Sequence, residues 1–288
     1  HRERTRAFGL VVHDDEQHLA EQRARFGEAR HVVAHFRLGV DDAIEGREIA
    51  LARRVALARR YEQPRHDARR REDARHVQLL ADANPLIAGI VASGRPEQDG
   101  FRNHLEQLAR LPKVRGVRRV LHTQPDELST APRFVEHLRL LSEFGYPFDL
   151  CVLARQLPRA TALVDACPGV SFILDHCGVP DVKARAFEPW RTDLTELSHR
   201  PNVACKVSGL VAYADPARWT VAGLQPWVEH VLATFGWDRV VWGGDWPVCT
   251  LSATLRRWVE ATHALTDSAT DEQRAELFHR NAERIYRV

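Results

Sequence analysis

Methionine is absent from this 288-residue sequence, lysine occurs only three times, and no two cysteines are spaced as CxxC. The five cysteines are scattered, and an odd number without local pairing indicates buried thiols in a reducing compartment. No apolar run approaches the roughly 20 residues of a membrane-spanning helix, and the opening HRERTRAFGL lacks the apolar region of a signal peptide. These absences predict a cytoplasmic protein without a membrane partner. Because the chain starts with histidine, we also expect its amino terminus to be truncated or processed.

Positive and negative side chains are nearly equal in number. Lysine and arginine total 41 against 39 aspartates and glutamates, which gives a net charge of +2. Binding to nucleic acid relies on a clear basic excess, so we expect no nucleic-acid partner. A chain of 288 residues is long enough to bury a large core as one α/β barrel or as two smaller domains.

From about residue 86 onward, apolar runs typical of strands alternate with segments of helical periodicity. The alternation is typical of repeated βα units around a parallel sheet, so the expected fold class is α/β. A closed eight-stranded barrel needs two more strands than the six found here, and these must come from residues 1–85. The expected strands are 87–91, 114–121, 148–153, 170–175, 203–207 and 239–242, and the expected helices are 101–111, 132–144, 157–167, 189–199, 224–235, 252–265 and 271–286.

Residues 1–75 differ in composition from the rest of the chain. They are rich in arginine, histidine and alanine, with 17 arginines and none of the three lysines or seven tryptophans. Short strands fit within 8–12 and 31–36, both flanked by polar residues. Three explanations stay open: a basic helical arm for an anionic partner, a divergent folded pair of βα units, or a frame-shifted or mis-annotated gene segment. We therefore predict an anomalous segment, 1–75, followed by a barrel domain, 76–288.

Two of the expected strands are followed by residues whose side chains can take part in catalysis or bind a metal ion. Residues 170–176, VSFILDH, end in Asp175 and His176. Residues 239–248, RVVWGGDWPV, deliver Asp245 after two glycines. An aspartate at the mouth of an apolar strand is costly to bury unless it is paired, binds a metal or takes part in chemistry. Because the strand carboxyl ends of a parallel barrel face one pocket, His176 and Asp245 are expected to converge in a hydrolytic site.

Seven segments carry a resemblance to a known family, and the motifs DHCGVP and WGGDWP within them are specific. In chain order they are ADANPLIAGIV (81–91), KVRGVRRVL (113–121), FDLCVLARQLP (148–158), FILDHCGVPD (172–181), PNVACKVSGL (201–210), DRVVWGGDWPV (238–248) and RNAERIYRV (280–288). Residues from about 72 to 288 thereby resemble the amidohydrolase-related (amidohydrolase-2) metal-dependent hydrolases, and most of all the sugar-lactone hydrolases of the fuconolactonase and sulfomuconolactone-hydrolase type. The resemblance implies a (β/α)8 TIM barrel whose third to eighth strands are the six above, and a role in carbohydrate catabolism.

In that family the first strand ends in an HxH pair of metal ligands, and no HxH occurs in this sequence. The resemblance leaves His176 and Asp245 as ligands for a divalent ion such as zinc or manganese, or else a site that works without metal. An aspartate at the end of the last strand can take a proton from the attacking water, which is the general-base role expected for Asp245. His176 would bind the metal ion or donate a hydrogen bond to the substrate carbonyl.

Four further residues are predicted to contact the substrate: Arg118, Lys206, His122 and Trp246. Arg118 resembles the arginine of the family's GVR motif, and a guanidinium suits an oxyanion or a carboxylate, but a buried structural salt bridge would leave the same sequence. Lys206 lies inside an apolar strand, where a lysine is more often functional than structural. His122 follows a strand end, and Trp246 is expected to form the pocket wall. Asp175 is expected to orient its neighbours or to cap the strand end rather than to bind substrate.

The sequence therefore predicts a hydrolase that opens a small cyclic ester resembling a sugar lactone. Two alternatives stay open, since a decarboxylase of the same superfamily would share His176 and Asp245, and an inactive remnant of the family would lack the HxH pair. A third, nucleic-acid binding through the arginine-rich segment, requires binding that falls steeply with salt. Nothing in the sequence predicts an oligomeric state.

Overall fold

The computed structural model describes residues 10–12, 32–34, 74–75, 77–84 and 86–288. Eight strands form one sheet in the order β2-β1-β3-β4-β5-β6-β7-β8, and the strands from β3 onward are parallel neighbours. The six strands predicted after residue 86 are thereby confirmed. They are β3 (Ile90–Ser93), β4 (Val114–Val120), β5 (Phe148–Cys151), β6 (Phe172–Leu174), β7 (Val203–Val207) and β8 (Val240–Trp242).

Two short strands come from the amino-terminal part of the chain. β1 (Leu10–Val12) pairs in parallel with β3, and β2 (Val32–Ala34) pairs antiparallel with β1. Both lie within the two runs in which the sequence analysis placed the missing strands, although the antiparallel β2 departs from the expected parallel sheet. The rest of the predicted anomalous segment, 1–75, lies outside the described residues except for 74–75.

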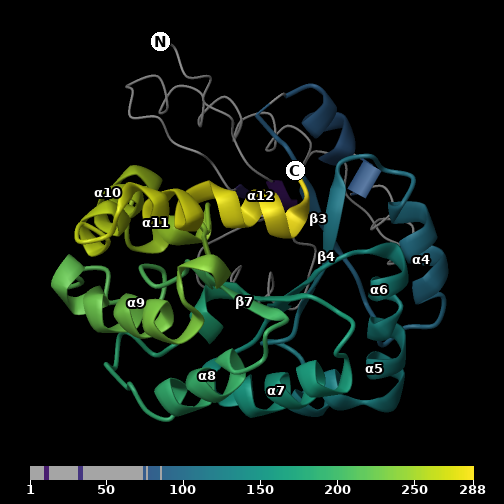
Figure 1. Cartoon of the computed structure of the whole chain (residues 1–288), viewed down its shortest axis with the longest axis horizontal. Helices are drawn as coiled ribbons and strands as arrows, with labels where there is room; N and C mark the ends of the chain where they lie inside the picture. The colour runs from purple at the N-terminus through teal and green to yellow at the C-terminus, as the bar shows by residue number, and fades with distance from the viewer. Residues whose placement is uncertain (1–9, 13–31, 35–73, 76, 85) are drawn as a thin grey trace.

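Helices follow the strands and surround them (Figure 1). The predicted helix 132–144 forms as two helices, and the predicted helix 271–286 contains a π-helical turn at Glu276–Arg280. No helix in the described part of the chain is long and apolar enough to cross a membrane. The α-helices that begin after residue 100 are α4 (Phe101–Leu108), α5 (Pro132–Arg139), α6 (Leu141–Phe144), α7 (Leu157–Ala166), α8 (Trp190–Ser198), α9 (Val221–Phe235), α10 (Leu255–Leu265), α11 (Asp271–Ala275) and α12 (Asn281–Tyr286).

Side-chain caps set the start of the three helices α9, α10 and α11. The hydroxyls of Thr220, Thr254 and Thr270 each accept a hydrogen bond from a backbone N–H three residues later. Such a cap satisfies a donor that has no partner within the helix, and it typically stabilises a helix by about 1 kcal/mol. The caps explain why α9 begins earlier, and α10 later, than the hydrophobic periodicity alone predicts.

Alternate residues of each strand point to opposite faces of the sheet. One face packs against the helices in the large hydrophobic core, which includes Phe148, Phe172 and Val240. The residues next to them in sequence point the other way, and some of these form a small separate cluster with α12. This inner cluster consists of Val91, Ile173, Val241, Ala282 and Tyr286.

The inner face also carries charged residues. Arg118 of β4 is in register with Asp149 of β5, which is in register with Ile173 of β6. Lys206 of β7 is in register with Val241 of β8. Because Ile173 and Val241 belong to the inner cluster, Arg118, Asp149 and Lys206 share its face, and all three are buried. The sheet therefore encloses an ionic interior rather than a purely apolar one.

Helix α12 packs near the amino ends of the strands, beside β3 and β4 (Figure 1). A Cβ atom added at Gly89, directly before β3, would lie 2.8 Å from Val288. One added at Gly116, near the start of β4, would lie 3.6 Å from the Tyr286 ring. The residues after the carboxyl ends of β6 and β8 therefore lie at the other end of the sheet from α12.

Candidate active site

His176 and Asp245, which the sequence analysis placed in one pocket, do lie together. The Nε2 atom of His176 is 3.7 Å from Oδ1 of Asp245, and both side chains are less than a tenth exposed. The residues follow the carboxyl ends of β6 and β8. Both have left-handed backbone conformations, with φ of 52° for His176 and 51° for Asp245. Such conformations cost about 1–3 kcal/mol in non-glycine residues and are concentrated at functional sites.

The end of β7 fixes the position of the imidazole. Nδ1 of His176 hydrogen-bonds with the hydroxyl of Ser208 over 2.9 Å. Gly209 follows with φ of +73°, and a Cβ atom there would lie only 2.7 Å from the Cβ of His176. Glycine is therefore required at position 209 both for its backbone conformation and for the approach of the histidine.

Replacement of Gly209 by alanine tests this close approach. Gly100 provides a matched control, because it has a similar φ of +78° but nothing within 4 Å of an added Cβ. We expect Gly100→Ala to cost only the left-handed backbone strain, about 1–2 kcal/mol. Gly209→Ala should cost a further ~1–3 kcal/mol from overpacking against His176. Urea unfolding of both variants measures the difference, and equal losses would contradict the proposed steric role.

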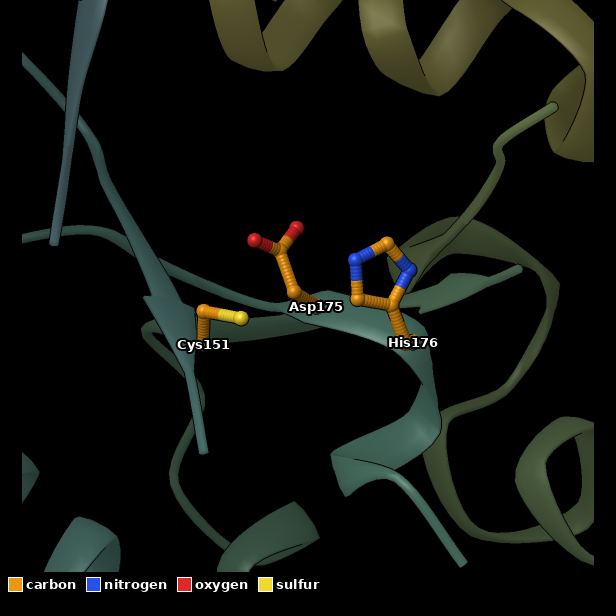
Figure 2. A group of neighbouring side chains, drawn as sticks. All are labelled: Cys151, Asp175 and His176. Atoms are coloured by element: carbon orange, nitrogen blue, oxygen red, sulfur yellow. The ribbon is translucent and has the colours of Figure 1, made fainter. Parts of the chain in front are cut away.

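Arg118 lies at the centre of the site. Its Nε atom is 2.8 Å from Oδ2 of Asp175. Its Nη2 atom donates to the sulfur of Cys151 over 3.0 Å and lies 3.4 Å from Nε2 of His176. Figure 2 shows Cys151, Asp175 and His176, with the sulfur of Cys151 directed toward Asp175 and the imidazole of His176 beside the carboxylate. The guanidinium thus contacts a thiol, a carboxylate and an imidazole at once.

Lys206 connects this centre to the interior of the sheet. Its ammonium group forms an ion pair with Oδ2 of Asp149 and lies 2.8 Å from Oδ1 of Asp175. The hydroxyl of Tyr286 donates to the second oxygen of Asp149. Lys206 therefore bridges two carboxylates, and Asp175 has one cation beside each of its oxygens.

The enclosed cluster contains two cations, Arg118 and Lys206, and three carboxylates, Asp149, Asp175 and Asp245. Burial alone would raise the pKa of Asp175, but the charges of Arg118 and Lys206 hold it well below its usual value. Burial likewise opposes the charged form of Arg118, yet Asp175 and the Cys151 sulfur raise its pKa above the normal range. Both members of the Arg118–Asp175 pair are therefore ionised at neutral pH.

Asp245 is the third carboxylate of the enclosed cluster. Burial raises its pKa to about 7, and the negative charge of Asp175 adds to the shift while Arg118 opposes it. Its Oδ2 atom is buried and has no hydrogen-bond partner among the described residues. A carboxyl group that titrates near neutrality can accept and return a proton at physiological pH, as a general base must.

The other three residues predicted to contact the substrate lie at the border of the site or in its interior. Nδ1 of His122 lies 3.6 Å from the sulfur of Cys151, so the histidine borders the site. Trp246 is partly buried and packs against the large core. Lys206 is almost fully buried between its two carboxylates. Substrate contact by His122, Trp246 and Lys206 stays a prediction.

Sequence reasoning missed several residues of the site. Asp149 lies within an apolar strand, the same signal that drew attention to Asp245. Cys151 follows it by two residues on the same face and was interpreted only as a buried thiol. Burial raises the pKa of Tyr213, and the next largest influence is the charge of Asp245, which places this tyrosine near the site. Nothing local in the sequence indicates Tyr286, because its partner is 137 residues away.

Comparison with known proteins gives the family. The model of the family described as Amidohydrolase matches residues 17–288, nearly the whole chain. The chain belongs to this family. The match begins well before residue 72, where the motif resemblance began. It includes most of the segment that the sequence analysis found anomalous.

Individual amidohydrolase relatives agree with this assignment. An L-fucono-1,5-lactonase from Burkholderia ambifaria is 31% identical over 196 residues, which cover 64% of this chain and 65% of that enzyme. An uncharacterized protein of Sinorhizobium fredii is 29% identical over 221 residues, 74% of each chain. A solved amidohydrolase from Burkholderia multivorans with bound zinc is 27% identical, with a TM-score of 0.72 over 76% of this chain and 80% of that one. The predicted barrel-type α/β fold and hydrolase class are therefore confirmed.

Three side chains of this amidohydrolase could hold a divalent metal ion. One ligand atom each from Cys151, Asp175 and His176 lies within 4.8 Å of the other two, and all three residues are buried. The group contains His176 of the predicted ligand pair but not Asp245, which lies beside it. Thiolate, carboxylate and imidazole are all ligands of zinc-like ions. The guanidinium of Arg118 contacts the same three residues, so an ion bound among them would take its place.

Proposed function

We propose that this amidohydrolase is a lactonase that opens a small cyclic ester of the sugar-lactone type. The observation that carries the proposal is Asp245, a buried carboxyl group with a pKa of about 7 and an oxygen without a hydrogen-bond partner among the described residues. It lies beside His176 and Arg118, two groups that stabilise negative charge on oxygen. Relatives named L-fucono-1,5-lactonase and L-rhamnono-gamma-lactonase support the substrate class.

In the proposed reaction Asp245 takes a proton from a water molecule as that water attacks the lactone carbonyl. The carbonyl oxygen becomes negatively charged in the tetrahedral intermediate. When the intermediate collapses, the bond from the carbonyl carbon to the ring oxygen breaks, and the proton held by Asp245 passes to the leaving alkoxide. The product is an open-chain hydroxy acid, and Asp245 regains its charge.

Arg118 and His176 are the groups proposed to stabilise the oxyanion. The ion pair with Asp175 fixes the guanidinium, and the contact with Ser208 fixes the imidazole. Donors held in place before the reaction stabilise developing charge without a reorganisation cost. The predicted substrate contacts of His122, Trp246 and Lys206 remain part of this proposal.

Of the two divalent ions predicted, zinc fits this donor set better than manganese, because a thiolate is among the donors. His176, Asp175 and Cys151 would hold it in place of the Arg118 guanidinium, so the role of Arg118 given above belongs to the enzyme without a metal ion. Asp245, the other residue of the predicted ligand pair, lies beside His176. When bound, such an ion lowers the pKa of a bound water molecule and polarises a carbonyl. Burial raises the pKa of the Cys151 thiol to about 11, so metal binding there would have to release a proton.

Hydrolysis of a panel of sugar lactones, followed by acid release, tests the proposal. We expect kcat/KM to rise with pH through an apparent pKa of about 7 and to level off above it, because only the ionised form of Asp245 accepts a proton. Elemental analysis and dialysis against a chelator in the same assay establish whether a metal ion is needed. Release of CO2 from aromatic acids without lactone opening would favour the decarboxylase, and inactivity in both assays would favour the inactive remnant.

A further inference from the structure

A series of buried contacts joins the last helix to the candidate site through the interior of the sheet. The hydroxyl of Tyr286 donates to Oδ1 of Asp149 over 2.8 Å. The other oxygen of Asp149 pairs with Lys206. Lys206 also lies 2.8 Å from Asp175, which in turn pairs with Arg118 at 2.8 Å. Every member of this series is less than a tenth exposed.

We propose that Tyr286 is a positioning residue for the reaction, and that it acts through this series to hold Arg118 against His176. The inference rests on the proposed lactonase function. It assigns a role to the closing helix α12, which packs at the amino ends of the strands, opposite the residues that would meet substrate.

The arrangement makes each contact dependent on the next. The two oxygens of Asp149 are divided between Tyr286 and Lys206, and the ammonium of Lys206 is shared between Asp149 and Asp175. Removal of the tyrosine hydroxyl leaves one Asp149 oxygen without its donor in a buried, weakly screened environment. The carboxylate and the ammonium then readjust, and Asp175 no longer has one fixed position from which to orient Arg118.

A purely structural role for Tyr286 can be separated from this one. Its ring packs in the inner cluster with Val91, Ile173 and Val241, and the Lys206 ammonium lies 5.7 Å from the ring centroid. Phenylalanine retains the ring and both of these contacts, so Tyr286→Phe removes only the hydroxyl. Tyr146→Phe is the matched control, because Tyr146 is partly buried and stacks on Phe144 away from the cluster.

Steady-state lactone hydrolysis by the wild type, Tyr286→Phe and Tyr146→Phe gives the first test. We expect Tyr286→Phe to lower kcat about tenfold or more with KM little changed, because the groups it positions act on the transition state. Tyr146→Phe should leave both parameters unchanged. A kcat for Tyr286→Phe equal to that of the wild type would overturn the proposal, as would a loss confined to thermal stability.

The combination with Asp149→Asn tests the route. If Tyr286 acts through Asp149, its hydroxyl should matter much less once the carboxylate is replaced, so the two fold-changes should not multiply in the double variant. If the fold-changes in kcat of the two single variants multiply in the double variant, Tyr286 does not act through Asp149, and the proposed series of contacts would be wrong. If Asp149→Asn does not fold, because Lys206 is then poorly paired, Tyr286→Phe alone decides.

A readout independent of activity separates this inference from the proposed function. In protein labelled with 15N-arginine, the Arg118 Nε–H resonance, assigned by its loss in Arg118→Lys, reports the ion pair with Asp175. We expect this resonance to shift in Tyr286→Phe and to stay in place in Tyr146→Phe. An unchanged resonance in Tyr286→Phe would overturn the inference. If the wild type opens no lactone, the proposed function fails, and this resonance decides the inference alone.

Discussion

Replacement of Asp245 by asparagine is expected to lower kcat for lactone opening by about 100- to 10,000-fold, the usual contribution of a general base. Asparagine has the shape of aspartate but cannot accept the proton of the attacking water. The residual rate should also lose the pH dependence near 7 that the wild type owes to this carboxyl group. Measurement of kcat/KM from pH 5 to 9 for both proteins tests the two expectations together.

The same substitution should have the opposite effect on stability. The pKa of Asp245 is about 7 in the folded protein and 3.8 without its surroundings, so the folded state binds the proton more tightly. The stability that this group contributes is complete below about pH 4 and is lost as the pH rises through 7. Asp245→Asn lacks this loss, so relative to the wild type it should gain up to about 4 kcal/mol between pH 4 and pH 8.

A distant aspartate controls for both effects. Asp99 is exposed and pairs with Arg133 across the surface at 3.1 Å. Asp99→Asn should leave the rate of lactone opening unchanged. It should also leave the change of unfolding free energy with pH as it is in the wild type. If Asp245→Asn retained full activity, another group would be the base, and the proposed mechanism would be wrong.

Replacement of Arg118 by methionine is expected to have the second large effect. It removes a buried cation that contacts Asp175, Cys151 and His176. Loss of one partner of a buried ion pair typically costs about 3–5 kcal/mol, because the other charge is left uncompensated. The rate should fall about 100-fold or more with the loss of oxyanion stabilisation. Arg118→Lys keeps the charge without the planar fork and should recover stability better than rate.

The neighbouring arginine is a matched control for Arg118. Arg119 is equally buried, and its guanidinium pairs with Glu97 at 2.6 Å. Side chains alternate along a strand, and Arg118 points to the inner face, so the next residue, Arg119, points away from the enclosed cluster. Arg119→Met should destabilise the protein but leave the kcat of the folded enzyme close to that of the wild type. A similar loss of rate in Arg119→Met and Arg118→Met would remove the case for a specific role of Arg118.

The sequence allowed prediction of features that depend on neighbouring residues. Strands β6 and β8 are wholly apolar, and His176 and Asp245 follow them within three residues. Their meeting at one pocket could therefore be derived from the geometry of parallel strands. Lys206 was singled out from the sequence as a substrate contact, which stays a prediction, and its partners were not predicted.

Contacts between residues far apart in the chain could not be derived in this way. Lys206 is 57 residues from Asp149, and Tyr286 is 137 residues from it. No local pattern links them, and only the strand register brings them to one face. The left-handed conformations of His176 and Asp245 were also not predicted, because such conformations are rare in residues other than glycine.

The excess of one carboxylate over cations in the enclosed cluster has a consequence for turnover. A lactone is neutral, whereas its hydrolysis product carries a new carboxylate. In the proposed reaction the acid forms beside Asp245 after that residue has protonated the alkoxide, and above about pH 7 the acid loses its own proton to solvent while Asp245 stays ionised. Arg118 and Lys206 are already neutralised by Asp175 and Asp149. Electrostatic repulsion then opposes retention of the product, so the pocket favours the uncharged ester and releases the acid.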